Sequence, residues 1–212
     1  IGATLLDLGR LDEAELRLRR ALASTLATLG PEHPTLSYSD ESLGRLSTLR
    51  GDFAAARVHL DRALAVREAS LDPEHIDVVE ALSGLALWWD RQGRCDQALP
   101  LLRRGQSALH RQLPADHIYN LVLDGHLARC SPVDDPARVP GLERAVAGLR
   151  VRGPARERAE LSLDLADALV PRGELTRARA LALEAAALLA TTGPGHAPER
   201  DRAARWLAAH PP

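Results

Sequence analysis

Apolar residues recur along the chain at the three- and four-residue steps of an α-helix. One set of stretches carries them at matching positions 42 residues apart, at Leu11, Ala14, Leu18 and Leu22 and then at Phe53, Ala56, Leu60 and Leu64. A second set alternates with the first, with apolar residues at Leu36, Leu43, Leu46 and Leu49 and then at Val79, Leu82, Leu85 and Trp89. Each stretch has an apolar and a polar face, so the pattern predicts an all-α chain built from pairs of amphipathic helices.

Two short sequence motifs mark the turns between the predicted helices. Glycine follows the first helix of each pair at Gly9, Gly51 and Gly93, where a left-handed residue can end a helix. Histidine follows the second helix at His33, His75 and His117, again 42 residues apart. A fixed period of this length is typical of stacked repeats, in which each unit buries its apolar face against its neighbours.

This frame predicts a single array over residues 1–212. Its repeats are expected at about 1–30, 31–72, 73–114, 115–152 and 153–192, with a capping helix at about 197–210. The fourth repeat is degenerate, because 131–136 replaces the glycine turn; a short second helix is expected at about 140–151, and a hinge at 131–140 is an open alternative. In the capping helix the pattern places Ala203, Trp206, Leu207 and His210 on one face and leaves Arg202 and Arg205 outside it.

Composition limits the possible partners and locations. The 27 basic residues are all Arg and face 29 acidic ones, which gives a formal charge of −2 and no broad basic field for nucleic acid or anionic lipid. No run of about 18 apolar residues occurs, so no membrane span is expected. Two cysteines are too few for a disulfide framework and no secretory leader opens the sequence, which favours the cytoplasm. Methionine is absent even at position 1, and Ile1 falls where the middle of a helix is expected, so we expect the chain to be part of a longer protein.

The residues that could carry chemistry are better explained as structural. Equivalent positions in stacked helix pairs lie about 10 Å apart, whereas zinc needs nitrogen ligands at about 2.0–2.1 Å, so the three loop histidines cannot share a metal ion. We expect each ring to bond a backbone group near the start of the next helix. Cys95 and Cys130 align with apolar positions of other repeats and are assigned to the core. We expect no metal, no cofactor and no catalytic residues; a catalytic domain, if any, would lie upstream.

Two motifs carry a resemblance to a known family. The stretch Leu82-Ser-Gly-Leu-Ala-Leu-Trp-Trp-Asp-Arg-Gln-Gly93 and the loop Gly30-Pro-Glu-His-Pro34 resemble tetratricopeptide repeats of the kinesin-light-chain type. This resemblance implies a right-handed superhelical solenoid of about five antiparallel helix pairs. The Arg- and Ala-rich ending, Ala203-Ala-Arg-Trp-Leu-Ala-Ala-His210, is similar to the C-terminal regions of large bacterial serine/threonine protein kinases. Related repeats also occur on bacterial nucleotide-switch ATPases and caspase-like proteases, and the sequence does not choose among these parents.

The resemblance also implies where a ligand would bind. First helices line the concave side of such arrays, which implies a groove for a protein or peptide partner, or for another domain of the same polypeptide. The groove positions carried over to this chain are Tyr38, Glu41, Ser42, Arg45, Glu80, Ser83, Leu87, Asp90, Arg91, His126, Arg129, Asp164 and Asp167. The paired asparagines with which the family grips a peptide backbone are replaced by Glu41-Ser42, Ser83-Gly84 and Gly125-His126. The alternative is a structural spacer or weak self-association module without a groove ligand, suggested by the incomplete edge at Ile1, Leu5 and Leu8.

Overall fold

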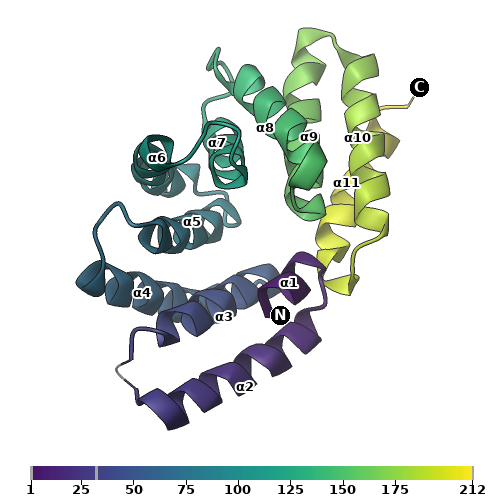
Figure 1. Cartoon of the computed structure of the whole chain (residues 1–212). Helices are drawn as coiled ribbons and strands as arrows, with labels where there is room; N and C mark the ends of the chain where they lie inside the picture. Colours follow the sequence, from purple (N-terminus) through teal and green to yellow (C-terminus); the bar gives the residue numbers. More distant parts are fainter. Residues whose placement is uncertain (1, 32, 212) are drawn as a thin grey trace. The chain divides into compact units, whose positions relative to one another are not determined.

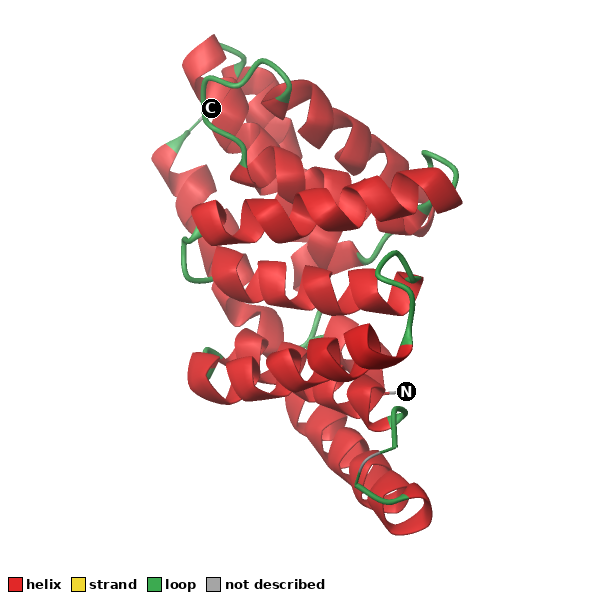
Figure 2. Ribbon diagram, turned by 90° about the vertical axis from the view of Figure 1, so that its left-hand side faces the viewer, coloured by secondary structure: helices red, strands yellow, loops and turns green. Residues whose placement is uncertain are grey.

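The computed structural model describes residues 2–31 and 33–211, and every regular element in that part of the chain is a helix (Figure 1, Figure 2). Its eleven α-helices are α1 (Gly2–Asp7), α2 (Leu11–Leu29), α3 (Leu36–Arg50), α4 (Phe53–Ser70), α5 (Ile76–Asp90), α6 (Cys95–Gln112), α7 (Ile118–Cys130), α8 (Arg138–Arg152), α9 (Ala155–Leu169), α10 (Leu175–Ala190) and α11 (Ala197–Ala209). Short 3₁₀ helices lie at Val170–Arg172 and Pro194–His196. The predicted all-α class is confirmed.

The chain forms two compact units, the first from residues 1–6 and 10–112 and the second from residues 7–9 and 113–212. In the first unit α3 packs against α4 and α5 against α6, while α2 contacts α3 and α4 contacts α5. In the second unit α7 packs against α8 and α9 against α10, α8 contacts α9, and α11 packs on α10. Figure 1 shows α9 and α10 side by side as one such pair. Within each unit, successive helix pairs therefore stack on one another.

The buried residues of each unit follow the apolar faces expected from the sequence. The first unit buries one cluster at Leu5, Leu6, Ala14, Leu18, Leu43 and Leu46 and another at Ala56, Leu60, Leu85 and Trp88. The second unit has a larger core that includes Leu142, Leu149, Leu161, Leu165, Leu169, Ala182 and Trp206. Cys130 is buried, as expected of a core position, whereas Cys95 is only partly buried, and neither cysteine is a free thiol.

A left-handed glycine separates the two helices of each regular pair. Gly51 has φ 78° and follows α3 directly, and its N–H donates to the carbonyl of Thr48 at 3.1 Å. The next residue, Asp52, donates its N–H to Ser47 and accepts a hydrogen bond from the N–H of Ala55 on its own carboxylate at 3.1 Å. The turn thus ends α3 and caps α4 within two residues, as the spacing predicts.

The three loop histidines perform the structural role expected of them. The Nδ1 atoms of His33, His75 and His117 accept hydrogen bonds from the backbone N–H groups of Thr35, Asp77 and Tyr119 at 3.3, 3.2 and 3.3 Å. His75 and His117 occupy the N-cap positions of α5 and α7, where a side-chain acceptor satisfies an otherwise unpaired helical N–H. The histidines that recur every 42 residues therefore each stabilise the start of a helix.

The fourth helix pair is joined by a longer loop instead of a glycine turn. The loop spans 131–137, and Asp135 orders its end by accepting a hydrogen bond from the N–H of Ala137 at 2.8 Å. Helix α8 then begins at Arg138, two residues before the predicted start, and Pro140 falls in its first turn. A proline is tolerated there because the first helical N–H groups have no intrahelical acceptor.

Candidate functional site

In the first unit, the structure places the predicted groove residues on α3 and α5 and at the end of α5. Tyr38 is exposed, and the others are all partly buried: Glu41, Ser42 and Arg45 on α3, and Glu80, Ser83, Leu87, Asp90 and Arg91 on or directly after α5. None of them belongs to the buried core of this unit. First-helix positions chosen from the repeat frame therefore form a partly accessible surface.

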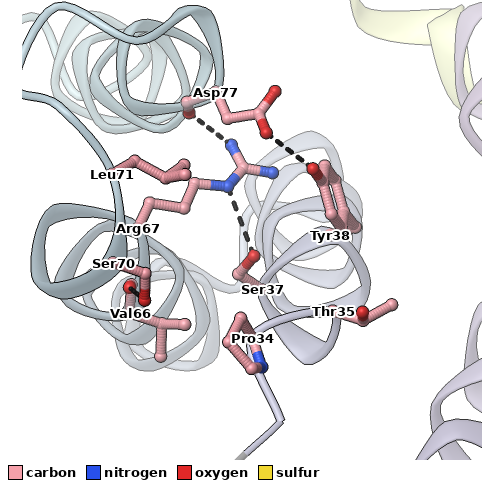
Figure 3. A pocket seen from close by; sticks show the side chains of 9 residues that line it. All are labelled: Pro34, Thr35, Ser37, Tyr38, Val66, Arg67, Ser70, Leu71 and Asp77. Atoms are coloured by element: carbon pink, nitrogen blue, oxygen red, sulfur yellow. Dashed lines mark hydrogen bonds between the residues drawn. The ribbon is translucent and has the colours of Figure 1, made fainter.

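A buried arginine that the sequence reasoning missed connects these two helices. Arg67 lies on α4, is only 2% exposed and extends between α3 and α5 (Figure 3). Its Nη1 donates to the carbonyl of Asp77 at 2.6 Å, its Nε donates to Ser37 Oγ at 3.3 Å, and its Nη2 lies 2.7 Å from a carboxylate oxygen of Glu41. The predicted groove residue Glu41 is thus committed to an internal ion pair.

A small pocket of about 170 Å³ opens beside Arg67. Its lining residues come from the start of α3, the end of α4 and the start of α5 and are Pro34, Thr35, Ser37, Tyr38, Val66, Arg67, Ser70, Leu71 and Asp77. Figure 3 shows the Tyr38 ring on one side of the Arg67 guanidinium and the aliphatic side chain of Leu71 on the other. The guanidinium carbon lies 4.8 Å from the centre of the Tyr38 ring, a cation–π distance.

Tyr38 is held in place by its hydroxyl group. The phenol donates to Asp77 Oδ2 at 2.6 Å, and 49% of the residue remains exposed. This hydrogen bond, together with partial burial and the negative charge of Asp77, raises the pKa of Tyr38 above its usual value. The ring is therefore a fixed, half-exposed aromatic surface at the edge of the pocket.

The serine hydroxyls that line the pocket form hydrogen bonds within the protein. The hydroxyl of Ser70 donates to the carbonyl of Val66 at 2.8 Å, and that of Ser37 accepts from Arg67. The N–H groups of Arg67 are already bound to residues of α3 and α5. The pocket therefore exposes mainly the apolar surface of Pro34, Val66 and Leu71.

In the second unit, the predicted residues Arg129 and Asp164 are brought together. Arg129 Nε on α7 lies 3.4 Å from Asp164 on α9, and its Nη1 lies 3.4 Å from Glu160. His126 lies one turn earlier on α7 and is partly buried. Asp164 is buried, which differs from the open position expected of it, because arginines from two other helices surround its carboxylate.

The stripe of α9 that carries Asp164 belongs to a larger ionic network. Arg156, 2% exposed, pairs with Glu157 and with Glu160 at 2.8 Å, and lies 3.9 Å from Glu199 of α11. Burial lowers the pKa of Arg156 and the three carboxylates raise it, with a net upward shift, so the guanidinium stays charged. The i,i+4 spacing of Arg156 and Glu160 could have predicted that the two side chains pair, but not that they are buried.

The fourth predicted residue of this unit, Asp167, contacts the last helix. Trp206 Nε1 donates to one oxygen of Asp167 at 2.7 Å, and Arg202 Nη2 donates to the other at 2.7 Å. Arg202 also donates to Asp164 at 2.7 Å. Arg202, expected outside the apolar stripe of the capping helix, is partly buried, because its long side chain turns towards the two aspartates of α9, which compensate its charge.

Comparison with known proteins places the chain among helical repeat proteins. A family model described as tetratricopeptide repeat matches residues 35–109, and a second model of the same description matches residues 1–35. No curated protein sequence matches the chain. None of the helices in the described residues is both long and apolar enough to cross a membrane.

Two solved structures resemble this fold. One is a kinesin light chain from Podosopora anserina with nearly identical TPR-like repeats, at 24% identity and TM-score 0.59, covering 84% of this chain and 89% of that one. Another is BtubC (BKLC) from P. vanneervenii, at 15% identity and TM-score 0.55, covering 94% of this chain and 87% of that one. At these identities the likeness shows a shared fold, and the match to tetratricopeptide-repeat structures agrees with the predicted fold class.

Proposed function

The chain carries tetratricopeptide repeats, and on this premise we propose that it is a non-catalytic scaffold that binds a protein or peptide segment in a concave groove lined by its first helices. Tetratricopeptide repeats stack into extended surfaces, and such surfaces are used for recognition of other proteins. The partner is a separate protein or another domain of the same polypeptide. We propose that residues 1–212 form one array that binds no nucleic acid and no cofactor.

The observation that carries the proposal is the pocket beside Tyr38. The tyrosine ring is half exposed, its hydroxyl is fixed by Asp77, and an apolar-lined recess lies next to it. Aromatic residues held rigidly beside small pockets are frequent anchors of protein interfaces, because they bury a large area and lose little conformational entropy on binding. We infer that this pocket receives one apolar side chain of the bound segment.

The first-helix side chains favour side-chain insertion over a grip on the peptide backbone. Glu41 is already bound to Arg67, and Ser83 donates its hydroxyl to the carbonyl of Val79 at 2.8 Å. These groups occupy the positions of the family's paired asparagines, and an internal partner reduces what each can offer to a ligand. Leu87, partly buried one turn further along α5, adds apolar surface to the same helix face.

Affinity capture with paired variants tests the proposal. The chain carrying Tyr38→Ala and Leu87→Ala should lose a partner that the unchanged chain retains, because both substitutions remove apolar contact area on the first-helix face. Val58→Ala is the matched control, since Val58 is 68% exposed and lies on the second helix α4. Capture should survive the control, and identical partners for all three proteins would refute groove binding. Circular dichroism verifies that each variant keeps its helicity.

A finer proposal concerns the parent protein. The similarity of the ending at 203–210 to bacterial serine/threonine kinases supports a regulatory region of a larger cytoplasmic signalling protein. The reading frame that encodes this segment tests it directly: an in-frame kinase domain upstream of Ile1 supports the proposal, and an upstream ATPase or protease domain replaces it.

A further inference from the structure

The carboxylate of Asp77 lies at the rim of the Tyr38 pocket and keeps one oxygen available to a ligand. Its Oδ2 accepts the hydrogen bond from Tyr38 and lies 3.8 Å from Nδ1 of His75. In the part of the chain that the structure describes, Oδ1 has no hydrogen-bond or ion-pair partner. Figure 3 shows this oxygen pointing away from Tyr38 and Arg67, and 18% of the side chain remains exposed. A bound segment can therefore reach Oδ1 from solvent.

The arginines at the same end of α4 are paired with other carboxylates. Arg67 lies 2.7 Å from Glu41, and Arg62, five residues earlier, lies 3.3 Å from the buried Asp40. The side chain of Asp77, in contrast, is within ion-pair distance of no arginine of the described chain. Its charge is stabilised by the start of α5, where the helix dipole favours an anion. The rim of the pocket therefore carries a carboxylate without a guanidinium partner.

The ionisation of Tyr38 indicates the same excess of negative charge. The charge of Asp77 raises the pKa of Tyr38, Arg67 lowers it by less, and Glu80 raises it further. The electrostatic potential at this edge of the pocket is therefore negative. Such a rim attracts a cationic group of an approaching ligand and repels a carboxylate.

Apolar surface and negative charge thus lie next to each other at one site. The pocket measures about 170 Å³ and exposes Pro34, Val66 and Leu71, while Asp77 closes it on the side of α5. A ligand residue whose apolar side chain fills this space brings the residues on either side of it to the rim. Arginine and lysine have side chains long enough to reach a carboxylate from such a neighbouring position.

We infer that the pocket beside Tyr38 selects a segment of a partner protein in which an apolar residue is flanked by arginine or lysine, with the apolar side chain in the pocket and the cation on Oδ1 of Asp77. This inference rests on the proposed groove function and adds the charge of the ligand to it. Because the ion pair is partly exposed, it contributes more to selectivity than to affinity.

Three synthetic peptides test the inference on the full chain. The first is acetyl-Gly-Arg-Leu-Arg-Gly-amide, the second has citrulline in place of both arginines, and the third has glycine in place of leucine. Citrulline keeps the shape of arginine without its charge, and arginine on both sides makes the result independent of chain direction. Titrations followed by the NMR amide signals of Tyr38 and Asp77 give each Kd. The citrulline peptide should bind about two- to fivefold more weakly than the first, the effect of one exposed ion pair, and added salt should reduce this difference.

A matched pair of variants assigns the preference to Asp77. Asp77→Asn should remove the preference for arginine over citrulline, and its amide oxygen can still accept the hydrogen bond from Tyr38. Asp61→Asn makes the same change at an acidic residue of α4 that pairs with Arg57, and this variant should keep the preference. A preference that survives Asp77→Asn would overturn the inference.

The peptide comparison on the unchanged chain separates this inference from the proposed function and needs no variant to fold. Equal affinity for the arginine and citrulline peptides would overturn the inference and leave apolar insertion intact. Equal affinity for the leucine and glycine peptides would refute apolar insertion, and no binding of any peptide at millimolar concentration would refute both. Shifts of the same signals with rising chain concentration, before any peptide is added, would identify a second copy as the occupant and overturn the inference.

Discussion

At the residue scale, the loop histidines act as helix caps, and His75 provides the clearest test. Its Nδ1 accepts from the N–H of Asp77 at the start of α5. His75→Ala should lower the free energy of unfolding by about 0.5–2 kcal/mol, the usual cost of a lost N-cap acceptor, and His75→Asn should recover much of it. Urea denaturation measures both. If the asparagine variant is as unstable as the alanine variant, the ring contributes something other than its acceptor.

A second residue-scale prediction concerns the ionisation of Tyr38. The chain has two tyrosines, so the Tyr119→Phe background isolates Tyr38 in a spectrophotometric titration. Its folded-state pKa is raised, chiefly by the hydrogen bond to Asp77, so this contribution to stability is present below the unfolded pKa of about 10 and is lost as pH rises through the folded pKa. Asp77→Asn should lower the tyrosine pKa. An unchanged titration would show that the hydroxyl does not bind Asp77 in solution.

Residue contacts divide into those that sequence can predict and those that it cannot. The histidine caps follow from local spacing, since each ring bonds a group two residues away. Arg67 reaches Ser37 and Arg202 reaches Asp164 across 30 and 38 residues. The repeat pattern predicts which helix carries such an arginine, but not the direction of its long, flexible side chain. The residues of the candidate site were therefore only partly predictable from the sequence.

At the element scale, the contact between α3 and α4 depends on the absence of a side chain at Gly44. A Cβ atom at this position would lie 2.6 Å from Leu60 Cγ and 3.3 Å from the Leu60 backbone nitrogen. Gly44→Ala should therefore destabilise the chain by about 1–3 kcal/mol through overpacking, although alanine favours an isolated helix by about 1 kcal/mol. Thermal or urea denaturation measures this difference.

Gly84 on α5 provides the matched control for that prediction. A Cβ atom there would meet only a terminal methyl of Leu60, at 3.1 Å, and this flexible side chain can move. Gly84→Ala should be neutral or slightly stabilising. Equal destabilisation by both substitutions would mean that small residues are required on first helices for a reason other than the approach of α4.

Element boundaries were predictable wherever a glycine or histidine phrase marks them. Gly51 and Gly93 end their first helices with left-handed geometry, as the frame requires. The fourth pair lacks the glycine phrase, and there the predicted start of the second helix was two residues late. Local turn chemistry thus determined how well each boundary could be placed.

At the scale of the whole molecule, the proposed scaffold and the self-association alternative predict different masses in solution. The self-association alternative was suggested by the apolar residues Ile1, Leu5 and Leu8 at the N-terminal edge of the array. Leu5 is buried and Leu8 is exposed, and Ile1 lies outside the described part of the chain. Three of the exposed large apolar residues lie on α2, where Leu16, Leu26 and Leu29 are 51%, 38% and 47% exposed.

We expect a monomer of 22.9 kDa in light scattering over a wide concentration range. A stable dimer usually buries about 800 Å² on each partner, and the three exposed leucines of α2 supply only a small part of such an area. If the mass nevertheless rises with concentration, Leu26→Glu with Leu29→Glu should restore the monomer, whereas Val58→Glu on α4 should not. That pair of results would support an association module built on α2.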